Sequence, residues 1–137
     1  MLNNRRYKTT KGDDTIKKHY QVIENILELL NTIEEGILYA QSQIAELLYE
    51  EAFTILQDTM EGISCIESAL EPMKSELIDN NIDILFIDLK EKVGKVVDSK
   101  AQEQQSDLEG QISKEIFPIF LRWKEEMEKT LKPYIVS

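Results

Sequence analysis

The stretch that decides the fold is residues 16–47, IKKHYQVIENILELLNTIEEGILYAQSQIAEL, in a chain of 137 residues. Its apolar side chains recur mostly every three or four residues, which is the spacing that places them along one face of an α-helix. They are Ile16, Tyr20, Ile23, Leu27, Leu30, Ile33, Ile37, Ile44 and Leu47. The pattern predicts a long amphipathic helix whose apolar stripe packs against a core or a partner helix.

Three further stripes with the same spacing follow. They are Ala52, Leu56, Met60, Ile63, Ile66, Leu70, Met73 and Leu77; then Ile82, Leu85, Leu89, Val93, Val96 and Val97; then Leu108, Ile112, Ile116, Ile119, Trp123, Met127 and Leu131. The chain has only 5 glycines and 3 prolines, whereas an all-β sandwich needs frequent turn signals. We therefore predict an all-α fold, an antiparallel up-down bundle of about four helices.

The connection between the first two helices has no obvious turn residue. An unbroken helix over residues 15–71 would be roughly 85 Å long, too long for a domain of this size. We therefore expect a tight reversal or sharp bend near residues 48–52. Pro72 lies inside the second stripe, so it either kinks that helix or starts a new one after a break at Glu71. The stripe continues in phase beyond Pro72, which favours the kink.

Polar clusters predict the later boundaries. Asn and Asp side chains bond to their own backbone in turns, so residues 79–81, Asp-Asn-Asn, should end the second helix. Residues 98–107 contain one apolar side chain and form either a loop or a solvent-crossing helix. Their good helix formers favour the helix. Pro118 is a second candidate for a kink.

The N-terminal residues differ in composition from the rest of the chain. Residues 1–13 have almost no apolar content, so we expect a mobile basic tail. Asp13 or Asp14 is the expected cap of the first helix. The predicted organisation is therefore a disordered basic tail over residues 1–13 and a single helical bundle domain over residues 14–137.

The net charge of −10 is spread unevenly. Residues 1–12 contain Arg5, Arg6, Lys8 and Lys11 and no acid, whereas residues 19–73 contain no Lys or Arg. The acids of that second stretch are Glu24, Glu28, Glu34, Glu35, Glu46, Glu50, Glu51, Asp58, Glu61, Glu67 and Glu71. They form either a solvated face that maintains solubility or a surface for a basic partner. Such a surface repels nucleic acid, which only the basic tail would attract.

The location of the protein is predicted from what the chain lacks. The densest apolar run, residues 116–121, ends at Arg122 and is much shorter than the roughly 20 residues of a membrane span. Residues 1–18 lack the apolar segment of a secretory signal. We expect a soluble cytoplasmic protein with no membrane partner. The lone Cys65 fits a reducing compartment, and we expect its thiol to fill the core.

Residues that carry chemistry are scarce. One His and one Cys exclude a disulfide framework and a Cys/His zinc site. His19 has no Glu three residues away, as a di-iron bundle requires, and is expected at the surface or at a helix start. Glycine-rich phosphate loops are absent. Adjacent acids such as Glu34 and Glu35 point about 100° apart on a helix. We therefore predict a non-enzyme without catalytic, metal-binding or cofactor-binding residues.

Apolar side chains beside the four stripes, together with Trp123 of the fourth stripe, are the candidates for binding a partner. Tyr and Trp suit this role because they combine a large contact area with a polar tip. They either widen the core seam or form a groove or dimer face that accepts an amphipathic helix. The candidate partner-binding residues are Leu38, Tyr39, Leu48, Tyr49, Phe53, Phe117, Phe120, Leu121 and Trp123.

Two neighbouring runs carry a resemblance. Residues 45–53, AELLYEEAF, and residues 56–63, LQDTMEGI, resemble the hinge and second helix of the FliT and FlgN flagellar export chaperones. The pattern of helix lengths and acid content is similar over residues 15–132. The resemblance implies a cytoplasmic protein that holds a helix of an export substrate, with residues 112–131 forming or covering the groove. The basic N-terminal tail and the polar residues 102–106 depart from that family, and no individual functional residue transfers.

Three hypotheses for function follow. The first is a non-catalytic adaptor or chaperone that holds a basic amphipathic helix of a partner in an acid-rimmed apolar groove. The second is a structural or regulatory homo-oligomer in which the same surface pairs with itself. The third is a phage-type or nucleic-acid-associated accessory protein that uses its basic tail as an electrostatic arm.

Overall fold

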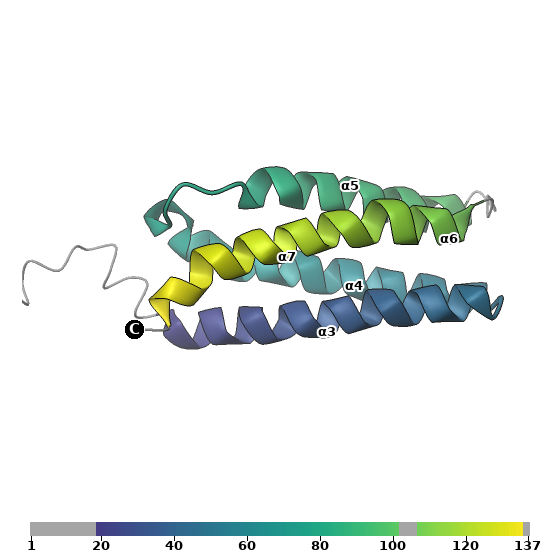
Figure 1. Cartoon of the computed structure of the whole chain (residues 1–137), viewed down its shortest axis with the longest axis horizontal. Helices are drawn as coiled ribbons and strands as arrows, with labels where there is room; N and C mark the ends of the chain where they lie inside the picture. Colours follow the sequence, from purple (N-terminus) through teal and green to yellow (C-terminus); the bar gives the residue numbers. More distant parts are fainter. Residues whose placement is uncertain (1–18, 102–106, 136–137) are drawn as a thin grey trace, which may run out of the picture.

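Four helical arms run antiparallel, side by side, in a computed structural model that describes residues 19–101 and 107–135 (Figure 1). The elements are α3 (Tyr20–Ala45), α4 (Tyr49–Leu70), η1 (Glu71–Glu76), α5 (Ile82–Ala101), α6 (Leu108–Gly110), η2 (Gln111–Ile116), α7 (Phe117–Leu131) and η3 (Lys132–Tyr134). α6, η2 and α7 follow one another without a break and form the fourth arm. No residue in the described ranges is in a strand. The predicted all-α up-down bundle is confirmed.

The core is a set of heptad seams. Apart from Gln43 and Phe53, the buried side chains of α3 alternate steps of three and four residues, and so do those of α4. They are Ile23, Ile26, Leu30, Ile33, Ile37, Ala40 and Ile44 in α3, and Ala52, Leu56, Thr59, Ile63, Ile66 and Leu70 in α4. This 3.5-residue period favours the shallow crossing angles of a helical bundle. Ile26 and Ala40 belong to the seam although the sequence stripe omits them, and Tyr20 and Leu47 of that stripe are exposed.

The reversal between α3 and α4 lies at residues 46–48, slightly before the predicted position. The Leu47 N–H donates to the Ile44 carbonyl at 2.9 Å, and the Leu48 N–H donates to the Gln43 carbonyl at 2.8 Å. These are the two hydrogen bonds of a Schellman motif, which requires a left-handed residue after the helix cap. Leu47 takes that conformation, with φ of 63°. The sequence contains no turn signal at this point, because Leu47 occupies the position after the helix cap where Gly is usual.

The prediction that Pro72 kinks a continuing helix is wrong. α4 ends at Leu70, and Pro72 lies in the first turn of the 3₁₀ helix η1. Pro is tolerated there because the N–H that it lacks has no helical partner at that position. Leu77 is extended and ends the segment. The prediction that residues 79–81 end the second helix is wrong, because the helical segment already ends at Glu76. Asn80 nevertheless bonds to the local backbone as expected of a turn residue, since its side chain donates to the Ile78 carbonyl and accepts from the Ile82 N–H.

Pro118 is accommodated by a change of helix type. Residues Gln111–Ile116 form a π-helical stretch, in which the Phe117 N–H donates to the Ile112 carbonyl five residues earlier. Pro118 follows directly, in the first turn of α7. The wider turn lies where the proline ring would otherwise crowd the preceding carbonyls. The predicted fourth stripe remains buried throughout, from Leu108 to Leu131.

Lys74 joins the first helical pair to the second. Its ammonium donates to Glu67 of α4 and Glu71 of η1 and forms an ion pair of 2.8 Å with Asp83 of α5. Burial alone lowers the Lys74 pKa, but the hydrogen bonds to these three carboxylates outweigh it and raise the pKa above its usual value. The network fixes the approach of α5 to α4.

Several predictions fall where the structure gives no description. The expected tail over residues 1–13, the cap at Asp13 or Asp14, and residues 102–106 lie outside the described residues. His19 immediately precedes α3, as expected for a helix-start residue. α5 continues to Ala101, so the first part of the polar stretch 98–107 is helical, in line with its composition.

Candidate partner-binding groove

Three of the nine predicted partner-binding residues are core residues. Phe120 and Trp123 have no exposed surface, and Phe53 is 2% exposed. Trp123 packs between Phe86 and Phe120, with ring centroids 6.4 Å and 6.0 Å away. The prediction that these three lie on a partner-binding surface is wrong. The surplus of apolar residues in α7 serves its central place in the bundle, where more than one helix covers it.

The other six predicted residues are at least partly accessible. Tyr49 and Phe117 are half-buried against the core, while Leu38, Tyr39, Leu48 and Leu121 are exposed. An ion pair of 2.5 Å between Glu34 of α3 and Lys124 of α7 aligns these two helices. Because the helices are antiparallel, Leu38 and Leu121 follow the same α3–α7 seam on one side of that pair. Tyr39 lies on a different seam, between α3 and α4.

The α3–α4 seam has an outer side that faces away from the rest of the bundle. α3 and α4 each carry a second stripe beside the core stripe, again with three- and four-residue steps. The stripe residues are Val22, Asn25, Leu29, Thr32, Gly36 and Tyr39 on α3, and Glu51, Ile55, Asp58, Gly62, Cys65 and Ala69 on α4. All are exposed or half-buried. We call this surface the outer groove.

The outer groove contains two hollows. One, of about 270 Å³, lies at the start of α3 between Val22, Leu29, Cys65 and Ala69, and its floor is formed by Ile26 and Ile66. The other, of about 330 Å³, lies near the reversal and is lined by Tyr39, Glu50, Glu51, Thr54 and Ile55. Both are open and mainly apolar, which is the form expected of a surface that takes side chains from a partner helix.

Two glycines bring the helices close together between the hollows. A Cβ added at Gly62 would lie 3.2 Å from Ile33 Cδ1, and one added at Gly36 would lie 3.4 Å from Thr59 Oγ1. The Gly62 distance is tighter than ordinary van der Waals contact, and the Gly36 distance is at its lower limit. The two hollows lie on either side of this close approach, toward the two ends of the α3–α4 seam.

The rim of the outer groove is acidic and has no described cation. Glu28 and Glu35 each precede a stripe residue of α3, and Asp58 and Glu61 occupy the equivalent part of α4. Within residues 19–98 and 107–135 these four carboxylates have no ion-pair partner. Two other acids of the hairpin, Glu34 and Glu67, bind lysines from outside it.

The expectation that the thiol of Cys65 fills the core is wrong. The thiol is exposed and lies in the first hollow. The neighbouring groove residues Val22, Leu29, Ile55 and Ala69 were also missed by sequence inspection. The signal for them is the second three- and four-residue stripe of each helix. It is hard to recognise because polar residues such as Asn25 and Asp58 interrupt it.

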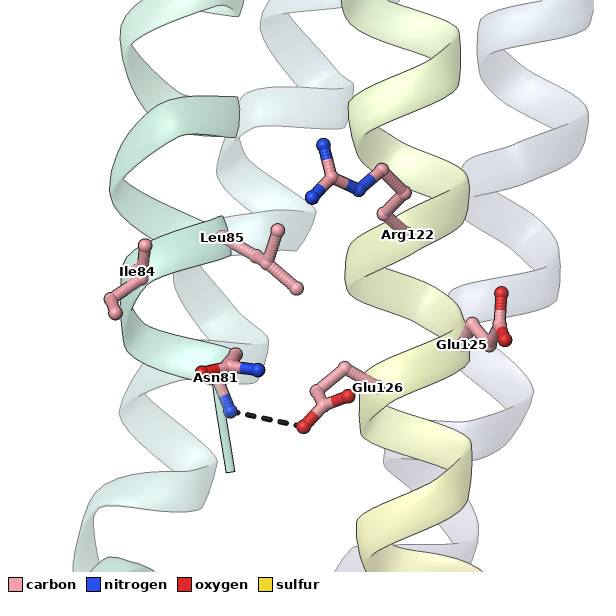
Figure 2. Close-up of a pocket in the computed structure, with 6 residues that line it drawn as sticks. All are labelled: Asn81, Ile84, Leu85, Arg122, Glu125 and Glu126. Atoms are coloured by element: carbon pink, nitrogen blue, oxygen red, sulfur yellow. Dashed lines mark hydrogen bonds between the residues drawn. The ribbon is translucent and has the colours of Figure 1, made fainter. Parts of the chain in front are cut away.

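A separate pocket of about 280 Å³ lies between α5 and α7 (Figure 2). Its wall contains Ile84, Leu85, Arg122 and Glu125, and the Asn81 N–H donates to Glu126 Oε2 at 3.0 Å. The one guanidinium is outnumbered by two carboxylates, so the pocket has no preference for an anion. This pocket therefore combines both signs of charge with apolar side chains, whereas the charged side chains of the outer groove are acids.

In the described part of the chain, no group of three or more His, Cys, Asp or Glu side chains has a geometry for holding a metal ion. None of its helices combines the length and hydrophobicity needed to cross a membrane.

One family model matches most of the chain. The profile of a domain of unknown function, DUF8042, matches residues 21–126, which is well over half of the 137-residue chain. The chain belongs to the DUF8042 family. No curated protein and no solved structure matches it. The matched DUF8042 region contains the whole outer groove, from Val22 to Ala69, and all four arms in part or in full.

Proposed function

We propose that this DUF8042 protein is a non-catalytic adaptor or chaperone that holds a basic amphipathic helix of a partner protein in the outer groove. The observation that carries the proposal is the charge of the α3–α4 hairpin. Residues 19–73 provide eleven carboxylates and no Lys or Arg, and the groove rim holds several that have no cationic partner in the described residues.

This charge distribution has a physical cost to the free protein. Helix surfaces gain roughly 0.2–0.5 kcal/mol from each Glu and Lys pair spaced four residues apart. α3 and α4 contain no such pair. A partner helix with Lys or Arg beside its apolar stripe would supply the missing cations, and complementary charge also speeds association and selects against acidic helices.

The apolar part of the outer groove would supply most of the binding free energy. Val22, Leu29, Ile55 and Ala69 are half-buried, and Tyr39 is 55% exposed. Covering such surface contributes about 25 cal/mol per Å² before the ordering of the partner is subtracted. A helix that inserts one apolar side chain into each hollow would use both ends of the groove.

Two further considerations support the proposal. The resemblance of residues 45–63 to flagellar export chaperones favours a helix-holding role in the cytoplasm over catalysis. The exposed thiol of Cys65, the chain's one cysteine, also suits a reducing compartment.

The test uses two synthetic helical peptides that share one apolar stripe of leucines. The polar positions carry Lys in one peptide and Glu in the other, and a fluorophore reports binding by anisotropy. We expect the full chain to bind the basic peptide, with an affinity that falls as salt increases, and to bind the acidic peptide at least tenfold more weakly.

Matched charge variants locate the site. The triple variant Glu35→Lys, Asp58→Lys, Glu61→Lys changes the rim of the outer groove. The control Glu109→Lys, Glu115→Lys, Glu125→Lys makes the same change in net charge at exposed positions of the fourth arm. We expect the rim variant to weaken binding at least tenfold and the control to weaken it less than threefold. Equal loss in both would show that net charge alone attracts the peptide, and the proposal would fall.

A further inference from the structure

The basic residues of the chain are concentrated directly ahead of the acidic hairpin. Of the 16 Lys and Arg residues, six lie in residues 1–18: Arg5, Arg6, Lys8, Lys11, Lys17 and Lys18. The same segment contains two acids, Asp13 and Asp14, so its formal charge is 6 − 2 = +4. The 55 residues from 19 to 73 contain no cation. The segment therefore has the charge that the proposed function requires of a partner.

The position of the first hollow places this segment beside the outer groove. Val22 and Asn25, which line that hollow, lie in the first two turns of α3, and the basic segment joins the chain just before them at His19. An extended segment of 18 residues reaches at most roughly 60 Å. α3, with 26 residues, is roughly 39 Å long. The segment is long enough to reach any part of the groove.

We propose that residues 1–18 bind the outer groove of their own chain and compete with a partner helix for it. This inference rests on the proposed function, because it treats the outer groove as a site for basic segments. Covalent attachment gives the segment an effective concentration on the order of millimolar, so even weak contacts occupy the groove. A partner must displace the segment. The apparent affinity of the partner is therefore its affinity for the open groove multiplied by the fraction of chains whose groove is open.

The reaction rate of the exposed Cys65 thiol reports whether the segment occupies the groove, so no probe has to be attached to the protein beforehand. Cys65 is the one cysteine of the chain and lies in the first hollow. The experiment measures its reaction rate with 4,4′-dithiodipyridine, an uncharged reagent whose local concentration does not depend on protein charge. The full chain is compared with the variant Arg5→Gln, Arg6→Gln, Lys8→Gln, Lys11→Gln.

A second variant controls for net charge. Lys90→Gln, Lys95→Gln, Lys114→Gln, Lys129→Gln removes four cations at exposed positions outside the hairpin. We expect Cys65 to react at least threefold faster in the N-terminal variant than in the wild-type chain, and at the wild-type rate in the control. High salt should speed the wild-type reaction and leave the N-terminal variant unchanged.

Two results would overturn the inference. One is an equal Cys65 rate in the wild-type chain and the N-terminal variant. The other is protection that increases with protein concentration, because this would show that a second copy provides the segment.

Binding of the basic peptide separates this inference from the proposed function. If both hold, the N-terminal variant binds the peptide at least threefold more tightly than the wild-type chain. If the wild-type chain and the variant bind the peptide equally and their Cys65 rates agree, the groove binds helices but the segment does not occupy it. If neither binds the peptide while their Cys65 rates differ, the segment occupies the groove and the proposed function fails.

Discussion

The α3–α4 hairpin and the α5–α7 half of the bundle have similar interiors and different surfaces. Both bury apolar residues at three- and four-residue steps. The second half also provides partners for its cations. Lys92 forms an ion pair of 2.7 Å with Asp88, and the Lys90 ammonium lies 5.8 Å from the centre of the Phe86 ring. The hairpin has no cation of its own. The interiors of both halves therefore follow the same pattern, whereas the surface of the hairpin lacks the Glu and Lys pairs that would stabilise its helices.

The largest effect is expected in the shared interior, where the two halves should not differ. Trp123→Ala removes a fully buried ring that packs against Phe86 and Phe120. We expect it to lower the free energy of unfolding by about 3–5 kcal/mol, measured by urea denaturation. Leu121→Ala, at a position that is 37% exposed, is the control and should cost well under half as much. Similar losses from both would contradict the assignment of Trp123 to the core.

The junction between the halves should give the next largest effect. Lys74→Met removes the ammonium shared by Glu67, Glu71 and Asp83, and Glu67 is already partly buried. We expect a loss of roughly 1–3 kcal/mol near neutral pH, because carboxylates are left without their partner.

The pH dependence of that loss has a definite sign. Since folding raises the Lys74 pKa, its contribution is complete below the unfolded value of about 10.5 and declines as the pH increases above it. The stability difference between wild type and Lys74→Met should therefore be constant from pH 6 to 9 and decrease above pH 10.5. A difference that stays constant well above pH 10.5 would show that the Lys74 ammonium does not carry the effect.

The tip of the hairpin should gain stability from a small change. Leu47 holds a left-handed conformation and is 70% exposed, so it contributes strain and little burial. Leu47→Gly should stabilise the protein by about 1 kcal/mol, because Gly adopts this conformation without steric cost. Thermal denaturation would detect the gain as a higher melting temperature. A lower melting temperature would show that Leu47 makes contacts that outweigh its backbone strain.

The smallest effect tests the surface of the hairpin directly. Glu28→Lys places a cation four residues after Glu24, in the favourable orientation along α3. We expect a gain of about 0.2–0.5 kcal/mol in stability, together with weaker binding of the basic peptide. A loss of stability would mean that the acidic surface supports the fold, which would remove the distinction between the two halves.

Sequence periodicity predicted which stripes of the four arms are buried. It did not predict the position of the first reversal or the number of helices that cover α7. Heptad spacing identified the four arms because burial imposes the same period on each of them. The reversal at Leu47 was misplaced because hydrogen bonds of the backbone close it without Gly or Asn. Phe120 and Trp123 were assigned to the surface because a wide apolar face on one helix does not reveal how many neighbours cover it.

The candidate site was predictable in its charge but, apart from Tyr39, not in its residues. The absence of Lys and Arg over residues 19–73 is visible in the sequence and indicated an acid-rimmed surface. The groove itself depends on the pairing of α3 with α4, which brings Leu29 and Cys65 to the same hollow from positions 36 residues apart. Only the tertiary arrangement shows that Cys65 is exposed while Ile66 beside it is buried.

Amide chemical shifts of the ¹⁵N-labelled full chain, mapped during titration with the basic peptide, would show whether the outer groove receives a basic helix. We expect the perturbed amides to follow the second stripes of α3 and α4, from Val22 to Tyr39 and from Glu51 to Ala69, and Ile84 and Ile87 on the exposed face of α5 to be unaffected. Perturbations centred on α5 and α7, or spread evenly over every acidic side chain of the bundle, would contradict this expectation.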